Sequence, residues 1–340
     1  MVDLRTNWMP GERGHDVAHN ESNKRINTLA GGYIFVETAD GDVLQQRVDE
    51  AVVGGKTVVL PFGTIAISRT LYLRNVSMVG RGAGKSILHF TGSGPALVVG
   101  DPNQATVLGG ARLADFTVGG AGSVESDGIR ISHASNAQFD RVNSHQFTRA
   151  AWDINGMAWV HTLRNCSGVN SGIGLAVASG GSAVNLTAFY GGRFSGTRGI
   201  VLGRREAGDL SMWRLGNISF YDVDIEGSTC EGLWIAEGMS INARGCRFES
   251  NNEGVEGGAH VVIDSGATAV TFDGCYFTDD YTHTAINARG GNTLSARGCS
   301  FVHGLQYEDS IGIRHAVPFV SDGNFFNRSV AQSSVEVAVA

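Results

Sequence analysis

The sequence predicts an all-β fold, a right-handed parallel β-helix with a capping helix at its N-terminal end. The first observation is a two-strand unit that recurs roughly every 23 to 33 residues, a period typical of solenoids. It occurs as residues 232–235 followed by 243–248, and again as 260–263 followed by 272–277. The second observation is that both halves alternate apolar and polar residues with period two, as strands do. One coil cannot bury its inward face alone, so we expect successive coils to stack.

Stacking places equivalent residues of successive coils in columns, with neighbours roughly 4.8 Å apart. We expect two inward columns from the second strand of each unit. The first consists of Phe116, Val142, Cys166, Gly192, Val223, Cys246, Cys275, Cys299 and Asn324. The second is partly aromatic and consists of Val118, Ser144, Gly168, Phe194, Ile225, Phe248, Phe277, Phe301 and Phe326. The pattern is weakest at Gly168 and Gly192, where a register shift of one residue stays open.

Three columns are expected to point outward. The first runs through Thr117, Asn143, Ser167, Arg193, Asp224, Arg247, Tyr276, Ser300 and Phe325. The second runs through Gly119, His145, Val169, Ser195, Glu226, Glu249, Thr278 and Val302. The first strand of each unit contributes Arg130, Asp153, Ala176, Val201, Trp234, Val262, Asn287 and Arg314. Functional side chains are expected among these columns because the inward ones form the core.

The composition of the chain excludes several fold classes and binding partners. The 48 glycines and only 5 prolines fit many tight coil turns, and the lack of a triplet period excludes collagen. The net charge of −7 is spread along the chain, so the sequence predicts no nucleic-acid partner, which would require a basic stripe. The sequence contains no run of 18 or more apolar residues, so it predicts no membrane-spanning helix. The five cysteines are interpreted as free thiols, three of them small core residues in one inward column.

The chain is expected to divide into three parts. Residues 1–28 form a polar arm without a period, 29–329 form a single β-helix domain, and 330–340 form a C-terminal tail without a visible cap. Within the domain, about residues 42–53 form the capping helix, because Val43, Leu44, Val48, Ala51 and Val52 share one helical face. An uncapped final coil would expose strand edges and favour aggregation, so we expect this end to be covered.

The N-terminus carries no apolar segment of a secretory signal. We therefore expect a protein that acts where it is made, in the cytoplasm, or one that leaves the cell by lysis or a specialised route and acts extracellularly.

A resemblance to a known superfamily rests on residues 40–90. The predicted helix is followed by Gly-Gly-x-Thr-Val-x-Leu-Pro-x-Gly-Thr at 54–64 and by Gly-x-Gly-x-Gly at 80–84. This order resembles the N-terminal signature of the pectate-lyase-like β-helix superfamily, which includes phage tailspike depolymerases and rhamnogalacturonase-like enzymes. The coil repeat extends the resemblance to about residue 329. Tailspike-like proteins cover their C-terminal end by trimerising or by adding a further domain, so the resemblance implies a homotrimer or a further domain, and a virion-associated protein. Because the superfamily contains hydrolases, lyases, epimerases, transferases and inactive adhesins, the resemblance implies the fold and leaves the reaction open.

Paired carboxylates are the main candidate for chemistry. Asp224 and Glu226 are two residues apart on one strand and should point to the same face about 7 Å apart, with Glu249 stacked on Glu226 at about 5 Å. Glycoside hydrolysis needs two carboxylates at about these separations. The alternative is purely structural, because Arg193, Asp224 and Arg247 would form an alternating charge ladder on a solvated sheet face.

Arginine and aromatic side chains are expected around these carboxylates. Arg193, Arg247, Trp213, Trp234 and Tyr276 would bind sugar by charge pairing and ring stacking, as an acidic polysaccharide requires. Trp213 lies in the longest insertion, residues 204–214. A register shift of one residue would instead bury Trp234 in the core.

A second cluster follows at residues 278–283. Asp279 and Asp280 could hold Ca²⁺, with Tyr281 or His283 transferring the proton in a β-eliminating lyase or an epimerase. His283 would also line the sugar-binding cleft. For a hydrolase the sequence predicts no cofactor and no metal.

Three hypotheses follow from these observations. The first is a polysaccharide-degrading enzyme of phage-tailspike-like type that cleaves a surface or acidic glycan with the paired carboxylates. The second is a polysaccharide lyase or epimerase that uses the 279–283 loop. The third is a non-catalytic glycan-binding or structural β-helix spike.

Overall fold

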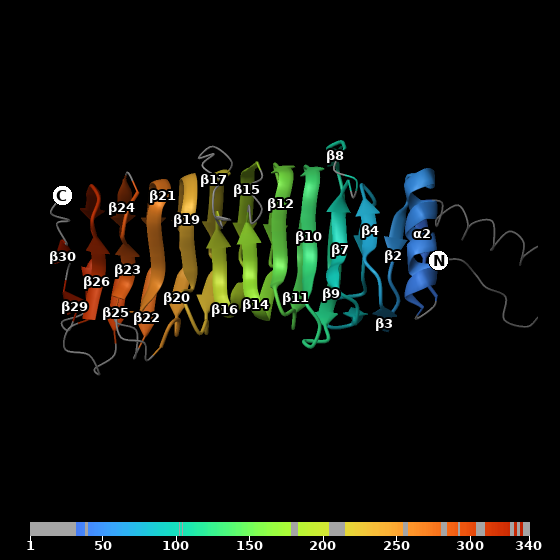
Figure 1. Ribbon diagram of the computed structural model, residues 1–340, viewed down its shortest axis with the longest axis horizontal. Helices are drawn as coiled ribbons and strands as arrows, with labels where there is room; N and C mark the ends of the chain where they lie inside the picture. The colour runs from blue at the N-terminus through green and yellow to red at the C-terminus, as the bar shows by residue number, and fades with distance from the viewer. Residues whose placement is uncertain are drawn as a thin grey trace, which may run out of the picture.

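A computed structural model confirms the predicted parallel β-helix. About ten coils follow one another along a single axis, with α2 at the N-terminal end (Figure 1). The structure describes residues 32–37, 40–101, 103, 105–177, 183–203, 215–253, 258–279, 284–291, 293–303, 310–326, 330–331 and 334–335. The expected N-terminal arm, residues 1–28, lies outside the described residues.

Each regular coil passes through three faces, which we call A, B and C in chain order. Face A contains β1 (Tyr33–Phe35), β2 (Thr57–Val59), β5 (Met78–Val79), β8 (Leu108–Gly109), β13 (Thr162–Arg164), β15 (Val184–Tyr190), β17 (Leu215–Tyr221), β24 (Leu294–Arg297) and β27 (Phe319–Asp322). Face B contains β3 (Gly63–Ile67), β6 (Ser86–Phe90), β18 (Asp224–Glu226), β20 (Arg247–Glu249), β22 (Tyr276–Asp279), β25 (Ser300–His303) and β28 (Phe325–Phe326). Face C contains β4 (Leu71–Arg74), β7 (Gly94–Gly100), β23 (Thr284–Ala288), β26 (Ser310–His315), β29 (Val330–Ala331) and β30 (Ser334–Val335).

Longer strands continue around a corner from one face to the next. Two of them, β9 (Arg112–Gly120) and β11 (Gln138–His145), pass from A to B, and β14 (Ser167–Val177) and β16 (Arg193–Leu202) pass from B to C. Four pass from C to A: β10 (Ser126–Ser135), β12 (Ala150–Trp159), β19 (Leu233–Arg244) and β21 (Ala259–Asp273). Every strand pairing among the described residues is parallel, so equivalent residues of successive coils stack on one another.

The expected columns are confirmed. Gly168 pairs with Phe194, and Phe194 pairs with Ile225, so the second inward column holds at the two weak coils. The open register shift does occur, but after this column, between Gly168 and Ser171. The third column is continuous from Arg130 through Trp234 to Arg314. Each residue of a column pairs with its counterpart in the next coil, so aligning the repeated strand units of the sequence places the columns.

The expectation that the three outward columns face solvent is wrong for several members. The polar residues Thr117, Asp153, Ser195 and Asn287 are only 4%, 3%, 6% and 7% exposed. The apolar members of the third column are buried too. Ala176, Val201 and Val262 are only 3%, 1% and 2% exposed. Trp234 stands between Val201 and Val262 in the same column and is itself half-buried. Face C therefore carries apolar packing on its outer side as well as its inner side.

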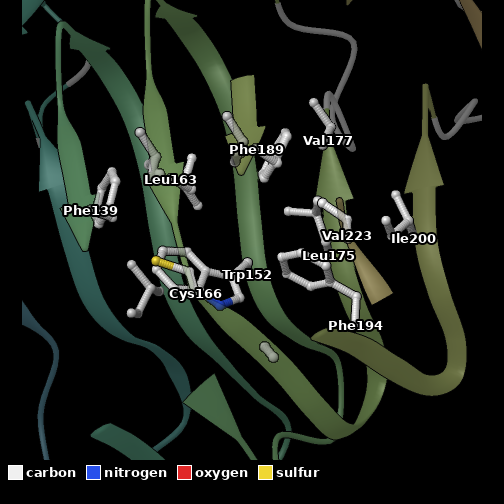
Figure 2. Close-up of a cluster of buried hydrophobic side chains, with 14 of the residues drawn as sticks. Phe139, Trp152, Leu163, Cys166, Leu175, Val177, Phe189, Phe194, Ile200 and Val223 are labelled. Atoms are coloured by element: carbon white, nitrogen blue, oxygen red, sulfur yellow. The ribbon is translucent and has the colours of Figure 1, made fainter. Parts of the chain in front are cut away.

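The core lies inside the coils, where Figure 2 shows Phe139, Trp152 and Phe194 pointing into the interior. The indole nitrogen of Trp152 donates to the carbonyl oxygen of Ser167 at 2.8 Å, so this buried polar group is satisfied. Toward the C-terminal end, rings of successive coils stack at centroid distances of 4.7, 4.9 and 4.8 Å, the members being Phe248, Phe277, Phe301 and Phe326. The cysteines are free thiols, and Cys246, Cys275 and Cys299 are buried beside this stack, as expected.

The corner between faces A and B is a single residue in the left-handed region. It is Asp222 in one coil, then Gly245 and Gly274, with φ of +54°, +62° and +59°. Each donates its N–H to the next coil, at 2.9, 2.9 and 2.8 Å respectively. Aspartate, asparagine and glycine tolerate this conformation best. The corner residues are Asp115, Arg141, Asn165, Gly191, Asp222, Gly245, Gly274, Gly298 and Gly323.

The capping helix α2 covers Gly41–Gly54, slightly longer than expected. Its N-cap is Asp40, whose carboxylate accepts the N–H of Asp42 at 2.9 Å, and Gly55 ends it with φ of +59°. Leu44, Val48 and Ala51 are buried against the first coil.

At the other end, β29 and β30 of the expected tail pair with β26 and begin a further coil. No helix among the described residues is long and apolar enough to cross a membrane.

Candidate functional site

The three candidate carboxylates lie together on face B. Asp224 and Glu226 are the two outward residues of β18, and Ile225 between them is buried in the core. Glu249 on β20 pairs in register with Glu226, while Arg247 pairs with Asp224. Neighbouring strands lie about 4.8 Å apart, and alternate residues of a strand about 7 Å apart. The structure therefore brings Asp224, Glu226 and Glu249 onto one surface.

The arginines contact the glutamates rather than the aspartate. Arg193 Nη2 lies 2.7 Å from Glu226 Oε1, and Arg247 forms an ion pair with Glu249 on its own strand. No ion pair within 4 Å joins either arginine to Asp224 among the described residues. The predicted Arg193–Asp224–Arg247 column exists in register, but the charge ladder that it suggested does not form.

Asp224 is the least compensated carboxylate of this group. Its Oδ1 is buried and has no hydrogen-bond partner among the described residues. Burial, assisted by the charge of Glu226, raises the pKa of Asp224, and the more distant Arg247 and Arg193 only partly oppose this. A carboxyl with a raised pKa beside ion-paired carboxylates is the arrangement that separates an acid from a base in glycosidases.

Tyr276 follows Arg247 in the column that contains Asp224, and its side chain is 41% exposed. Its ring stands one coil beyond Arg247, as expected. A phenol at this position can contact a sugar bound over Asp224, through its ring or its hydroxyl.

Trp234 lies elsewhere, on face C. Its indole nitrogen donates to Asp264 Oδ2 at 2.7 Å, and the Arg198 guanidinium covers the ring at 4.8 Å from its centroid. Arg198 in turn pairs with Glu231 at 2.9 Å. Trp234 therefore faces outward in register but does not join the face B carboxylates.

Two other predicted site residues, Trp213 and His283, lie outside the described residues. The same holds for Asp280 and Tyr281, so the loop offered for Ca²⁺ or β-elimination stays a prediction.

Sequence reasoning missed a second charged cluster, on face C. Arg130 donates to Asp127 at 2.8 Å and to Asp153 at 3.0 Å, and Asn155 donates to Asp153 at 2.6 Å. Burial, together with the Asp153 carboxylate, raises the pKa of Asp127. Because the two carboxylate side chains are only 1% and 4% exposed, they are closed to a polymer substrate. The column that placed Arg130 beside Asp153 was the available signal.

A second missed feature is an exposed ladder on face A, just before the corner. Tyr190 and Tyr221 stack there with ring centroids 4.9 Å apart and planes 10° apart. The guanidinium carbon of Arg164 lies over the Tyr190 ring, 5.3 Å from its centroid, and Arg244 follows Tyr221 in register. The sequence signal is a further column, one residue before each corner, in which Arg164, Tyr190, Tyr221 and Arg244 follow one another in register.

No protein family description and no curated protein matches this sequence. Solved structures do match. The A-module of the Azotobacter vinelandii mannuronan C-5 epimerase AlgE4 aligns over 88% of this chain and 97% of that module, with a TM-score of 0.65 and 15% identity. The chain has the right-handed parallel β-helix fold.

Two further structures share this fold. The catalytic unit of a GH87 α-1,3-glucanase from Streptomyces thermodiastaticus aligns over 85% of this chain and 66% of that one, with a TM-score of 0.52 and 13% identity. The gp42 tailspike of Acinetobacter phage vb_AbaP_AS12 aligns over 86% of this chain, with a TM-score of 0.55 and 10% identity. The chain spans 51% of that tailspike. At these identities the likeness establishes the fold and confirms the resemblance at that level.

Proposed function

We propose that the protein is a polysaccharide-degrading enzyme that cleaves glycosidic bonds with the face B carboxylates. The observation that carries this is the state of Asp224, a carboxyl with a raised pKa and a buried oxygen without a donor, beside glutamates that are each paired with an arginine. Glycan-active proteins among the structural neighbours, the epimerase and the glucanase, support a polysaccharide as the substrate.

In this proposal Asp224 is the general acid. It donates its proton to the oxygen of the leaving sugar, while Glu226 or Glu249 acts as the base that takes a proton from the attacking water. Water oxygen bonds to the anomeric carbon as the glycosidic bond breaks. Strand geometry sets Asp224 and Glu226 about 7 Å apart, within the range for inverting enzymes, so we expect inversion at the anomeric carbon.

The substrate would lie across the outward columns of face B. Arg193 and Arg247 border the carboxylates and are about half exposed, so each presents donors to sugar hydroxyls or carboxylates. Tyr276 offers a ring one coil further. The likeness to a phage tailspike is consistent with action on a surface glycan and with virion association.

The test is incubation of the protein with acidic and neutral polysaccharides, measuring both new reducing ends and ultraviolet absorbance. We expect the unmodified chain to release reducing ends without a rise in ultraviolet absorbance, and we expect Asp224→Asn to release none. Retention of turnover in Asp224→Asn, Glu226→Gln and Glu249→Gln, each tested singly, would overturn this site.

A second candidate is a polysaccharide lyase or C-5 epimerase, which the AlgE4 likeness favours. Both reactions begin with abstraction of the C5 proton of a uronate. A lyase would produce reducing ends together with absorbance from an unsaturated uronate, and an epimerase would produce neither while changing the uronate composition. A chelator effect would support Ca²⁺ in either case.

A further inference from the structure

A hollow lies on the face A side of the corner, next to the candidate carboxylates. Its volume is about 490 Å³, and it is lined by Tyr190, Tyr221, Asp222, Arg244, Gly245, Asp273 and Gly274. Asp222, Gly245 and Gly274 are the corner residues of three successive coils. Asp224, Arg247 and Tyr276 each follow two residues later on face B. The hollow and the carboxylates are therefore neighbours across a one-residue corner.

The change of corner residue from aspartate to glycine helps to open the hollow. Asp222 has a side chain at the corner, whereas Gly245 and Gly274 have none. A Cβ on Gly245 would meet Asp222 Oδ1 at 2.4 Å, so this carboxylate lies over the glycine. A Cβ on Gly274 would meet nothing within 4 Å, so that part of the floor is open.

The wall of the hollow is aromatic. Tyr190 and Tyr221 stack, and the outer face of Tyr190 is covered by Arg164. The other ring of the pair belongs to Tyr221, and the next residue in register after it is Arg244. Both tyrosines line the hollow, and a tyrosine ring is a surface on which the apolar face of a sugar ring can stack.

The polar groups of the hollow favour a neutral sugar. Two carboxylates, Asp222 and Asp273, line it with only one arginine, Arg244, which lies 3.4 Å from Asp273. Carboxylates accept hydrogen bonds from sugar hydroxyls, and Arg244 can donate one, but the net negative charge opposes a uronate. The corner N–H groups are all bonded to the next coil, so the floor is rigid before binding.

We propose that this hollow is a binding subsite for a neutral hexose unit of the glycan, which it holds beside the cleavage site. Tyr221 stacks on the sugar ring, and Asp222 and Arg244 bind its hydroxyls. The proposal rests on the proposed function for the nature of the ligand, since both assume a polysaccharide. It is separate in its residues, because none of the hollow residues is a proposed catalytic group.

The experiment is calorimetric titration of the full chain with defined hexasaccharides: neutral α-1,3-, β-1,3- and α-1,4-glucans, and acidic oligogalacturonate and oligomannuronate. The key variant is Gly274→Asn, because asparagine tolerates the left-handed corner and places a side chain in the open space. Its matched control is Gly298→Asn, one coil further, where φ is +58° and a Cβ also meets nothing within 4 Å, outside the hollow lining.

We expect a neutral hexasaccharide to bind the unmodified chain, and Gly274→Asn to weaken that binding at least tenfold while Gly298→Asn changes it less than twofold. Tyr221→Ala should weaken it about fivefold to tenfold, and Tyr221→Phe should restore it. Equal effects of the two asparagine variants, binding of acidic probes only, or no binding by any neutral probe would each overturn the proposal. Binding that depends on Gly274 while Asp224→Asn leaves turnover intact would refute the catalytic site and keep this subsite.

Discussion

Replacement of Asp224 by asparagine separates a catalytic role from a structural one. General acid catalysis contributes about 10²- to 10⁴-fold to a rate, so Asp224→Asn should lower turnover by that factor, or about 2.7 to 5.5 kcal/mol in activation free energy. The asparagine keeps the shape of the side chain and removes the proton that is donated to the leaving group. Glu226 and Glu249 keep their arginine partners, so the rest of the site should be unchanged.

The same substitution should not destabilise the protein. Because the fold raises the pKa of Asp224, the ionised carboxylate is less favourable in the folded state than in the unfolded chain. The protonated carboxyl of Asp224 makes its full contribution to the free energy of unfolding below pH 3.8, the ordinary pKa of an aspartate. This contribution declines as the pH rises through the raised pKa of the folded state. Asparagine removes that cost, so at pH 7 the urea midpoint should be equal to or higher than that of the unmodified chain.

The assay pairs reducing-end release with urea unfolding followed by circular dichroism. Asp140→Asn is a suitable control, because Asp140 lies on β11 outside the hollow, pairs in register with Arg164 and contacts Arg141 at 2.6 Å, away from the carboxylates. It should leave turnover within twofold. Retention of more than a tenth of the turnover by Asp224→Asn, or a loss of turnover accompanied by a clear fall in the urea midpoint, would refute the reasoning.

Three further predictions concern stability and the site. Phe277→Ala should lower the free energy of unfolding by about 3 to 5 kcal/mol, because the ring is fully buried and stacks on both sides, while Phe326→Ala at the end of the stack should cost less in the same urea titration. Burial lowers the pKa of His161 to about 4, so its neutral form stabilises the fold above about pH 6.5, and the urea midpoint should fall from pH 6.5 toward 4, a dependence weakened in His161→Gln. Arg193→Ala should lower kcat/KM by about tenfold or more, because it removes a donor to the sugar and leaves Glu226 without its 2.7 Å partner. A kcat/KM within about twofold of that of the unmodified chain would contradict both roles.

The columns could be predicted because each depends only on the repeat period and on alternation within a strand. The repeat period and the alternation are sufficient to predict the stack of Phe248, Phe277 and Phe301. They also predict the register between Asp224 and Arg247. The corner was harder to predict. Its glycines are visible in the later coils, but Asp222 and Arg141 occupy the same left-handed position earlier, so no single residue type marks it.

The coil period, the capping helix and the residues that share a column follow from the amino-acid pattern, because these features depend on local alternation and on parallel pairing. Which charged side chains meet depends on the folded structure. Arg193 and Arg247 were adjacent to Asp224 in their column, yet their long side chains contact Glu226 and Glu249 instead, and register does not restrict that choice. The folded structure also decides that Trp234 faces away from the carboxylates, and that a hollow opens beside Tyr221. These outcomes depend on side-chain reach and on the corner angle between faces, which no period in the sequence encodes.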